Sequence, residues 1–142
     1  MTFEQCLHAL LNCAGGDGNL LLNTGPMPDG QIEPRQANRL KEVGDWLVDN
    51  GETIYGTRGG PFKPGAWGVS THKENIIYLH IIQWEGKSIK LPPIDNKITS
   101  SVMLKGNNVD VKQSAQEIEV IVPESMRNKQ DTIVVLKLAD SA

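Results

Sequence analysis

The sequence has only two cysteines, few aromatic residues and no long apolar run. Aromatic residues make up 5% of its 142 residues, and 14 Lys and Arg residues are nearly balanced by 17 Asp and Glu residues. No basic cluster is present that would neutralise a phosphate backbone, so we expect no nucleic-acid partner. No apolar run approaches the ~20 residues that a membrane-spanning helix needs, so we expect no membrane partner either.

The two cysteines lie in one segment with helical periodicity. On an intact helix Cys6 and Cys13 are too far apart along the axis for disulfide geometry, so we expect two small buried apolar residues. His8 shares that segment. His72 and His80 fall on a later hairpin, where they lack a third ligand; we expect surface or cross-strand packing for them, with His80 close to Trp67 across the strands. The sequence therefore predicts no metal site, and no cofactor is implied.

The first part of the chain has the pattern helix, strand, loop, helix. Thr2 and Gln5 form a capping box, which predicts a helix from Phe3 that ends at Gly15 and Gly16. Met1 leads directly into this helix without the basic stretch and cleavage site of a signal peptide. As written, the product is expected in the cytoplasm.

A buried strand is predicted at Leu20–Leu22, because three consecutive leucines between two asparagines are typical of a strand covered on both faces. Gly25, Pro26 and the turn residues Pro28-Asp29-Gly30 end this strand. Pro34 then begins an amphipathic helix that runs to Asn50, with Gly51 expected at its C′ position. A strand of this kind needs parallel neighbours, which this chain does not supply.

The second part of the chain changes from a period of 3.6 to a period of 2. Residues 57–65 are rich in Gly and Pro and are interpreted as a linker between residues 1–56 and residues 66–142. Seven short, β-branched segments follow and predict an antiparallel sandwich. They are Trp67–Thr71, Ile76–Trp84, Ser88–Leu91, Ile98–Leu104, Val109–Gln113, Glu117–Val122 and Thr132–Leu138. The fold class is therefore α+β.

The run GDGNLLLNTGPMPDGQIEPRQANRLKEVGDWLVDNGETIYGT, residues 16–57, resembles the last strand and last helix of the (β/α)₈ barrel of the α-L-fucosidases of glycoside hydrolase family 29. The resemblance implies that residues 1–56 are a remnant of that barrel and that the sandwich is the family's C-terminal domain. A complete barrel needs about 250 residues, so the chain is too short to hold one.

Catalysis by this chain alone is not expected. Hydrolysis with retention needs two carboxyl groups about 5 to 5.5 Å apart, and Asp17 and Asp29 stand at opposite ends of the predicted strand. The resemblance implies that the nucleophile and the acid/base residue lie on earlier barrel strands, so no catalytic residue is assigned. It also implies that Asn23, Thr24 and Gly25 lie nearest a bound sugar, although Asn23 can equally hold the turn that it opens.

Two functions from different classes remain open. The first is a segment of a retaining α-L-fucosidase that meets a fucosylated glycan only in a complete barrel and is inactive alone; such a parent enzyme can be periplasmic or secreted. The second is a non-catalytic sandwich that binds carbohydrate, with Trp67 and Trp84 as its candidate platforms, or that gives structural support.

The unpaired strand also has consequences for partners. We expect it to be hidden by the two helices, by pairing with a second copy of the chain, or by a missing barrel fragment.

Overall fold

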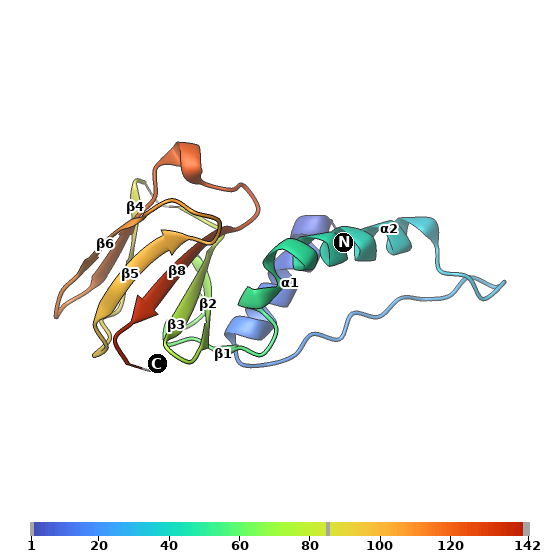
Figure 1. Ribbon diagram of the computed structural model, residues 1–142. Coiled ribbons are helices and arrows are strands. Elements are labelled where there is room, and N and C mark those ends of the chain that lie inside the picture. Colours follow the sequence, from blue (N-terminus) through green and yellow to red (C-terminus); the bar gives the residue numbers. More distant parts are fainter. Residues whose placement is uncertain (1, 85, 141–142) are drawn as a thin grey trace.

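The computed structural model describes residues 2–84 and 86–140, which form a helical part and a β-sandwich side by side (Figure 1). The helical part contains α1 (Phe3–Gly15) and α2 (Pro34–Asn50), followed by a short 3₁₀ helix at Gly51–Thr53. In Figure 1, α1 and α2 cross each other beside the sandwich, and α1 packs against Val69 of the sandwich. The mixed architecture confirms the predicted α+β class.

Helix α1 begins with the predicted capping box. The Gln5 backbone N–H donates to Thr2 Oγ1 at 3.1 Å, and the Thr2 backbone N–H donates to Gln5 Oε1 at 2.8 Å. The apolar stripe of the helix buries Leu7 and Leu11 against Val69 of the sandwich. Hydrophobic burial along this seam therefore attaches the helix to the sheet.

Helix α2 has the predicted bounds but a different ending. Gly51 has φ −59° and continues into the 3₁₀ helix, so the left-handed C′ cap expected there is wrong. A Cβ at this position would lie 2.7 Å from the Tyr55 ring, so a larger residue would require the exposed Tyr55 side chain to shift. No residue of α2 is buried in this structure.

The sandwich consists of two antiparallel sheets. The larger has the order β1-β2-β3-β8-β5 and the smaller the order β4-β7-β6. The strands are β1 (Arg58–Gly59), β2 (Gly68–Lys73), β3 (Ile76–Ile81), β4 (Ser88–Leu91), β5 (Ile98–Met103), β6 (Asp110–Gln113), β7 (Ile118–Ile121) and β8 (Thr132–Leu138). A second 3₁₀ turn, Glu124–Met126, precedes β8.

Strand β3 has one face toward each neighbouring layer. Ile77, Leu79 and Ile81 belong to the core between the two sheets. The alternate residues face the helices: Ile82, just beyond the strand, packs with the α1 cluster, and the Tyr78 hydroxyl lies 3.4 Å from Glu52 Oε2. This alternation places polar side chains of β3 at the seam between sandwich and helices.

The range 57–65, which the sequence predicts to lack regular structure, contains a strand. Arg58 and Gly59 pair with His72 and Thr71, and Phe62 is buried in the sandwich core. These residues therefore belong physically to the sandwich. The composition conceals this because a two-residue strand carries no readable period.

The strand expected at Leu20–Leu22 does not form in this chain. The segment between α1 and α2 runs beside the helices as extended chain without regular structure (Figure 1), and Leu21 is 83% exposed. The expectation that the two helices cover this strand is therefore wrong. The physical reason is that a parallel strand requires hydrogen-bonding neighbours, and no strand of the described residues pairs with this segment. Leu20 and Leu22 are half-buried.

Candidate functional site

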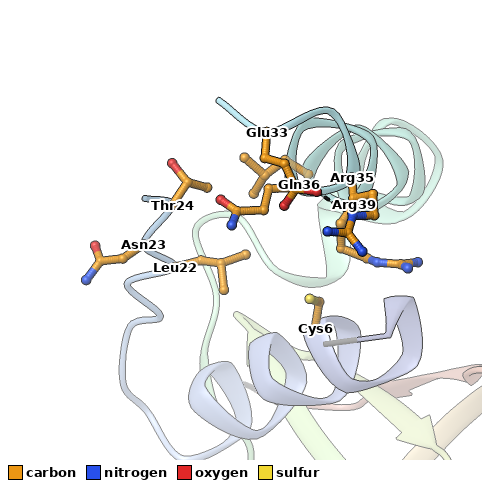
Figure 2. Close-up of a pocket in the computed structure, with 9 residues that line it drawn as sticks. Cys6, Leu22, Asn23, Thr24, Glu33, Arg35, Gln36 and Arg39 are labelled. Atoms are coloured by element: carbon orange, nitrogen blue, oxygen red, sulfur yellow. Dashed lines mark hydrogen bonds and ion pairs between the residues drawn. The ribbon is translucent and has the colours of Figure 1, made fainter. Parts of the chain in front are cut away.

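A cavity of about 440 Å³ separates the extended segment from the helices (Figure 2). It is lined by side chains of the segment, of α1 and of α2, namely Cys6, Leu22, Asn23, Thr24, Glu33, Arg35, Gln36, Arg39 and Leu40. Figure 2 shows Leu22 pointing toward α2 and Asn23 pointing away from it. The segment thus keeps the alternation of a β-strand without having a sheet to join.

The three residues predicted to lie nearest a sugar occupy this segment. Asn23 and Gly25 are exposed and Thr24 is half-buried. Within the part of the chain that the structure describes, no side-chain hydrogen bond joins Asn23 to the turn. The structure therefore leaves its amide free to meet a ligand or another chain, and the role of these residues stays a prediction.

The charged groups of this cavity do not form a hydrolytic pair. Glu33 is the one carboxylate among its lining residues, and it pairs with Arg35. Arg39 pairs with Glu42 on α2 at 2.5 Å. Retaining hydrolysis needs two carboxyl groups on opposite sides of one anomeric carbon, and this arrangement offers only a single ion-paired group. The described residues also contain no group of three His, Cys, Asp or Glu that could hold a metal ion.

Asp29 has the turn role expected from the sequence. Its Oδ1 accepts a hydrogen bond from the Gln31 backbone N–H at 3.0 Å, and Gly30 takes φ +87°. This is the local bond by which Asp holds a turn, so the carboxylate needs no catalytic explanation.

Asp17 fixes the point where the extended segment leaves α1. Its carboxylate accepts hydrogen bonds from Arg58 Nε at 2.7 Å and Arg58 Nη2 at 2.6 Å, and a third from the Gly59 backbone N–H at 3.0 Å. These bonds, the Arg58 pair above all, hold the pKa of Asp17 well below its ordinary value of 3.8. The bidentate pair ties the end of α1 to β1.

We expect Asp17→Asn to lower the midpoint temperature of unfolding at neutral pH. Because the pKa of Asp17 is lower in the folded state, its stabilisation is present above pH 3.8 and is lost as the pH falls further. The difference between variant and parent should therefore shrink below about pH 4. Asp45→Asn, which breaks the exposed Lys41–Asp45 pair of α2, should change the midpoint less. Equal midpoints for Asp17→Asn and the parent at pH 7 would contradict this assignment.

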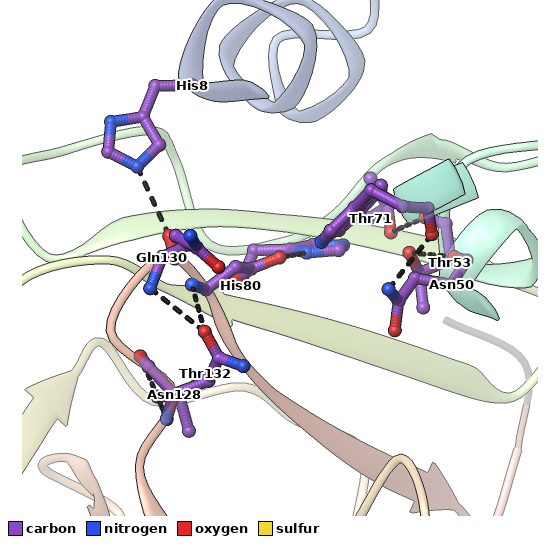
Figure 3. A network of polar contacts seen from close by, with 10 residues as sticks. His8, Asn50, Thr53, Thr71, His80, Asn128, Gln130 and Thr132 are labelled. Carbon is purple, nitrogen blue, oxygen red and sulfur yellow. Dashed lines mark hydrogen bonds and ion pairs between the residues drawn. The ribbon is translucent and has the colours of Figure 1, made fainter. Parts of the chain in front are cut away.

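A buried polar network joins the sandwich to the helices (Figure 3). His80 of β3 and Asp131, which precedes β8, lie 2.6 Å apart from Nδ1 to Oδ2, and both side chains are 0% exposed. His80 Nε2 and Asp131 Oδ1 are buried without a hydrogen-bond partner among the described residues. The His80 ring lies 6.3 Å from the Trp46 ring of α2, and His8 of α1 lies 3.2 Å from the Gln130 carbonyl oxygen.

The sequence did not reveal this pair. It predicted surface or cross-strand packing for the hairpin histidines and placed His80 close to Trp67, but the register pairs His80 with Val69. His72 is half-buried, and its Nδ1 lies 2.9 Å from the Gly59 carbonyl oxygen. The signal in the sequence was a polar residue, His80, between the apolar residues of a strand. A buried polar side chain needs a hydrogen-bond partner, so this position indicated a buried partner.

The two tryptophans proposed as platforms lie in different surroundings. The Arg127 guanidinium lies 4.0 Å above the centre of the Trp84 ring, and the remainder of the ring packs on the sandwich core. That face of Trp84 is therefore closed to stacking. Trp67 is half-buried and lines a cavity of about 380 Å³ beside β4.

Three comparisons relate this architecture to known proteins. A family model for α-L-fucosidase matches residues 1–52. Rat plasma α-L-fucosidase is 30% identical over 134 residues, which is 89% of this chain and 29% of the relative. Human plasma α-L-fucosidase is 35% identical over 89 residues, which is 59% of this chain and 19% of the relative. The chain therefore spans less than a third of the length of these curated relatives.

Solved structures extend the similarity to nearly all of the chain. The α-L-fucosidase isoenzyme 1 from Paenibacillus thiaminolyticus superposes with a TM-score of 0.86 at 28% identity, covering 99% of this chain and 35% of that one. The agreement includes the helical part and the sandwich in one arrangement. Sequence and structure agree, and the chain belongs to the α-L-fucosidases of glycoside hydrolase family 29.

Proposed function

We propose that this chain is a segment of a retaining α-L-fucosidase acting on fucosylated glycans and that it is inactive alone. The observation that carries the second part is the single ion-paired carboxylate among the residues lining the cavity beside Asn23 and Thr24. A retaining site needs two carboxyl groups, so the remaining chemistry must come from polypeptide outside this chain.

The exposed apolar residues of the helical part support the proposal that further polypeptide covers it. Leu21 and Val48 are 83% and 84% exposed, and the amphipathic helix α2 has no buried residue. Free-standing proteins seldom leave an amphipathic helix and an unpaired apolar segment uncovered. The partner proposed for this face is the missing part of a barrel, which would place a strand on each side of residues 20–24.

The experiment compares the chain with a chimera. In the chimera, this chain replaces the matching 35% of the Paenibacillus enzyme. We expect the chain alone to hydrolyse an aryl α-L-fucoside no faster than the blank, whereas the chimera should hydrolyse it. Leu22→Asp in the chimera should reduce activity strongly, because Leu22 lines the cavity and would meet the restored barrel.

The control is Asn19→Asp, which adds the same charge at an exposed position of the same segment. Turnover by the chain alone, abolished by replacing one of its acidic residues, would show that the chain is itself an enzyme. A folded but inactive chimera would count against the fucosidase assignment.

A further inference from the structure

The cavity beside Trp67 lies between the edges of the two sheets. β1 pairs only with Thr71 and His72 of β2, so the Trp67 end of β2 is an edge of the larger sheet. β4 is an edge strand of the smaller sheet. The cavity of about 380 Å³ is lined by Ala66, Trp67, Gln83, Ser88, Ile89 and Lys90. Its volume lies in the range of small-molecule sites.

The backbone holds Trp67 in a fixed place. Gly65 and Gly68 exchange hydrogen bonds of 3.0 and 3.1 Å, so Ala66 and Trp67 form the tip of a tight turn. Gly68 has φ +144°, and a Cβ there would lie 1.9 Å from the His80 carbonyl oxygen, so only glycine fits. A Cβ at Gly65 would lie 3.2 Å from Trp67 Cδ1, which shows that the indole edge packs over this glycine. The turn therefore presents the indole with little freedom.

Residues with hydrogen-bonding side chains line the same cavity as this indole. The Trp67 carbonyl oxygen accepts from the Gln83 backbone N–H at 3.2 Å, and the exposed Gln83 lines the same cavity as the ring. Ser88 Oγ donates to Glu119 Oε2 at 3.1 Å, and the exposed Lys90 lies on the same strand. Ile89 adds a buried apolar contact. The Ser88 hydroxyl oxygen can still accept a hydrogen bond, and the Lys90 amine lies 3.9 Å from Glu117 Oε1 at the surface. One flat apolar surface with an amide, a hydroxyl and an amine in the same cavity matches a pyranose ring, which has an apolar C–H face and a rim of hydroxyls.

We propose that the Trp67 cavity is a carbohydrate-binding site of the sandwich that takes a neutral pyranose ring of a glycan, stacked on the indole. The choice of a fucosylated glycan as the probe rests on the proposed function, whereas the site itself rests on the geometry of Trp67. Trp84 has no part in it, because Arg127 covers its ring and is held there by the carbonyl oxygens of Val122, Gly86 and Lys87.

The test is titration of the full chain with 2′-fucosyllactose, L-fucose and lactose, each up to tens of millimolar. Binding is monitored through the NMR signals of the amide and indole N–H groups. We expect saturable shifts at the Trp67 indole N–H and the Gln83 side-chain amide, with a Kd on the order of 1 mM. Trp67→Ala should weaken binding about tenfold or more, and Gln83→Ala should weaken it less. Trp46→Phe, in the separate cluster around α1, should leave the Kd unchanged.

Absence of shifts in the parent chain with all three sugars would overturn the proposal. Binding that survives unchanged in a folded Trp67→Ala would overturn it too. If Trp67→Ala does not fold, the exposed variants Gln83→Ala and Lys90→Ala decide, and unchanged affinity in both overturns the site. No hydrolysis is measured, so failure here leaves the fucosidase proposal standing, and an inactive chimera leaves this site standing.

Discussion

His80→Ala is expected to lower the free energy of unfolding by about 3 to 5 kcal/mol. The side chain lies at 0% exposure with Nδ1 2.6 Å from Asp131 Oδ2, and its removal leaves the Asp131 carboxyl buried without its partner. Such a loss is a large share of the ~5 to 15 kcal/mol that stabilises a typical domain. The Trp46 ring beside His80 would also lose a contact, so the seam between α2 and the sandwich should loosen.

The measurement is urea unfolding followed by tryptophan fluorescence at fixed pH. His72→Ala is the matched control, because His72 lies on the neighbouring strand and bonds through the same ring nitrogen, but to the Gly59 carbonyl oxygen and while only half-buried. His72→Ala should lower the free energy of unfolding by about 1 kcal/mol. Asp131→Asn should cost less than His80→Ala, because an amide oxygen can still accept from His80 and no buried charge remains. Equal midpoints for His80→Ala and His72→Ala would contradict the importance of this pair.

The same pair predicts a pH dependence. Burial raises the pKa of Asp131 above its ordinary value of 3.8, with the neighbouring His80 acting in the opposite direction. The folded chain then holds this proton more tightly than the unfolded chain does. Its stabilisation is present below pH 3.8 and is lost as the pH rises through the folded pKa. The Asp131→Asn variant has no ionisable group at this position. The difference between its free energy of unfolding and that of the parent should therefore shift in favour of the variant as the pH rises above about 4.

Helices and strands whose sequence signals lie close together along the chain could be predicted from the sequence. The capping box at Thr2 and Gln5 and the proline at position 34 both begin helices where the sequence placed them. Strands β4 and β8 have the predicted bounds, because their apolar residues and turns are contiguous in the sequence. Capping and period depend on neighbours three or four residues away, so the sequence displays them directly.

Contacts across long separations were not predictable in this way. His80 and Asp131 are 51 residues apart and meet only because β3 pairs with β8. Composition likewise could not show that Arg58 joins the sheet or holds Asp17 from 41 residues away. Such pairs follow from register, and register is set by the whole sheet.

The leucine segment fails as a strand for a different reason. Its sequence is that of a buried strand, and its alternation survives, with Leu22 turned toward α2. The partners that would make it a strand are absent from the described chain. The sequence pattern of these residues favours a strand, but no strand forms without strands to pair with.

We expect this chain to self-associate through the leucine segment and Leu21→Asp to make it monomeric. Leu21 is 83% exposed, and no strand among the described residues pairs with its segment. Covering one leucine side chain gains about 1.5 to 3 kcal/mol. Without a barrel, a second copy of the same segment is the available partner, and strand pairing would satisfy its backbone and bury Leu21 together. Sedimentation at increasing concentration should show association of the parent chain and none of the variant.

Two matched variants distinguish strand pairing from non-specific hydrophobic association. Asn19→Asp adds the same charge to the same exposed segment without removing an apolar side chain, and should leave most of the association intact. Val48→Asp removes an equally exposed apolar residue from α2, and should also leave it intact if the segment pairs through its backbone. Hydrogen exchange at residues 20–22 should slow with concentration in the parent alone. A parent chain that stays monomeric, with fast exchange at these residues at every concentration, would show that the segment does not pair.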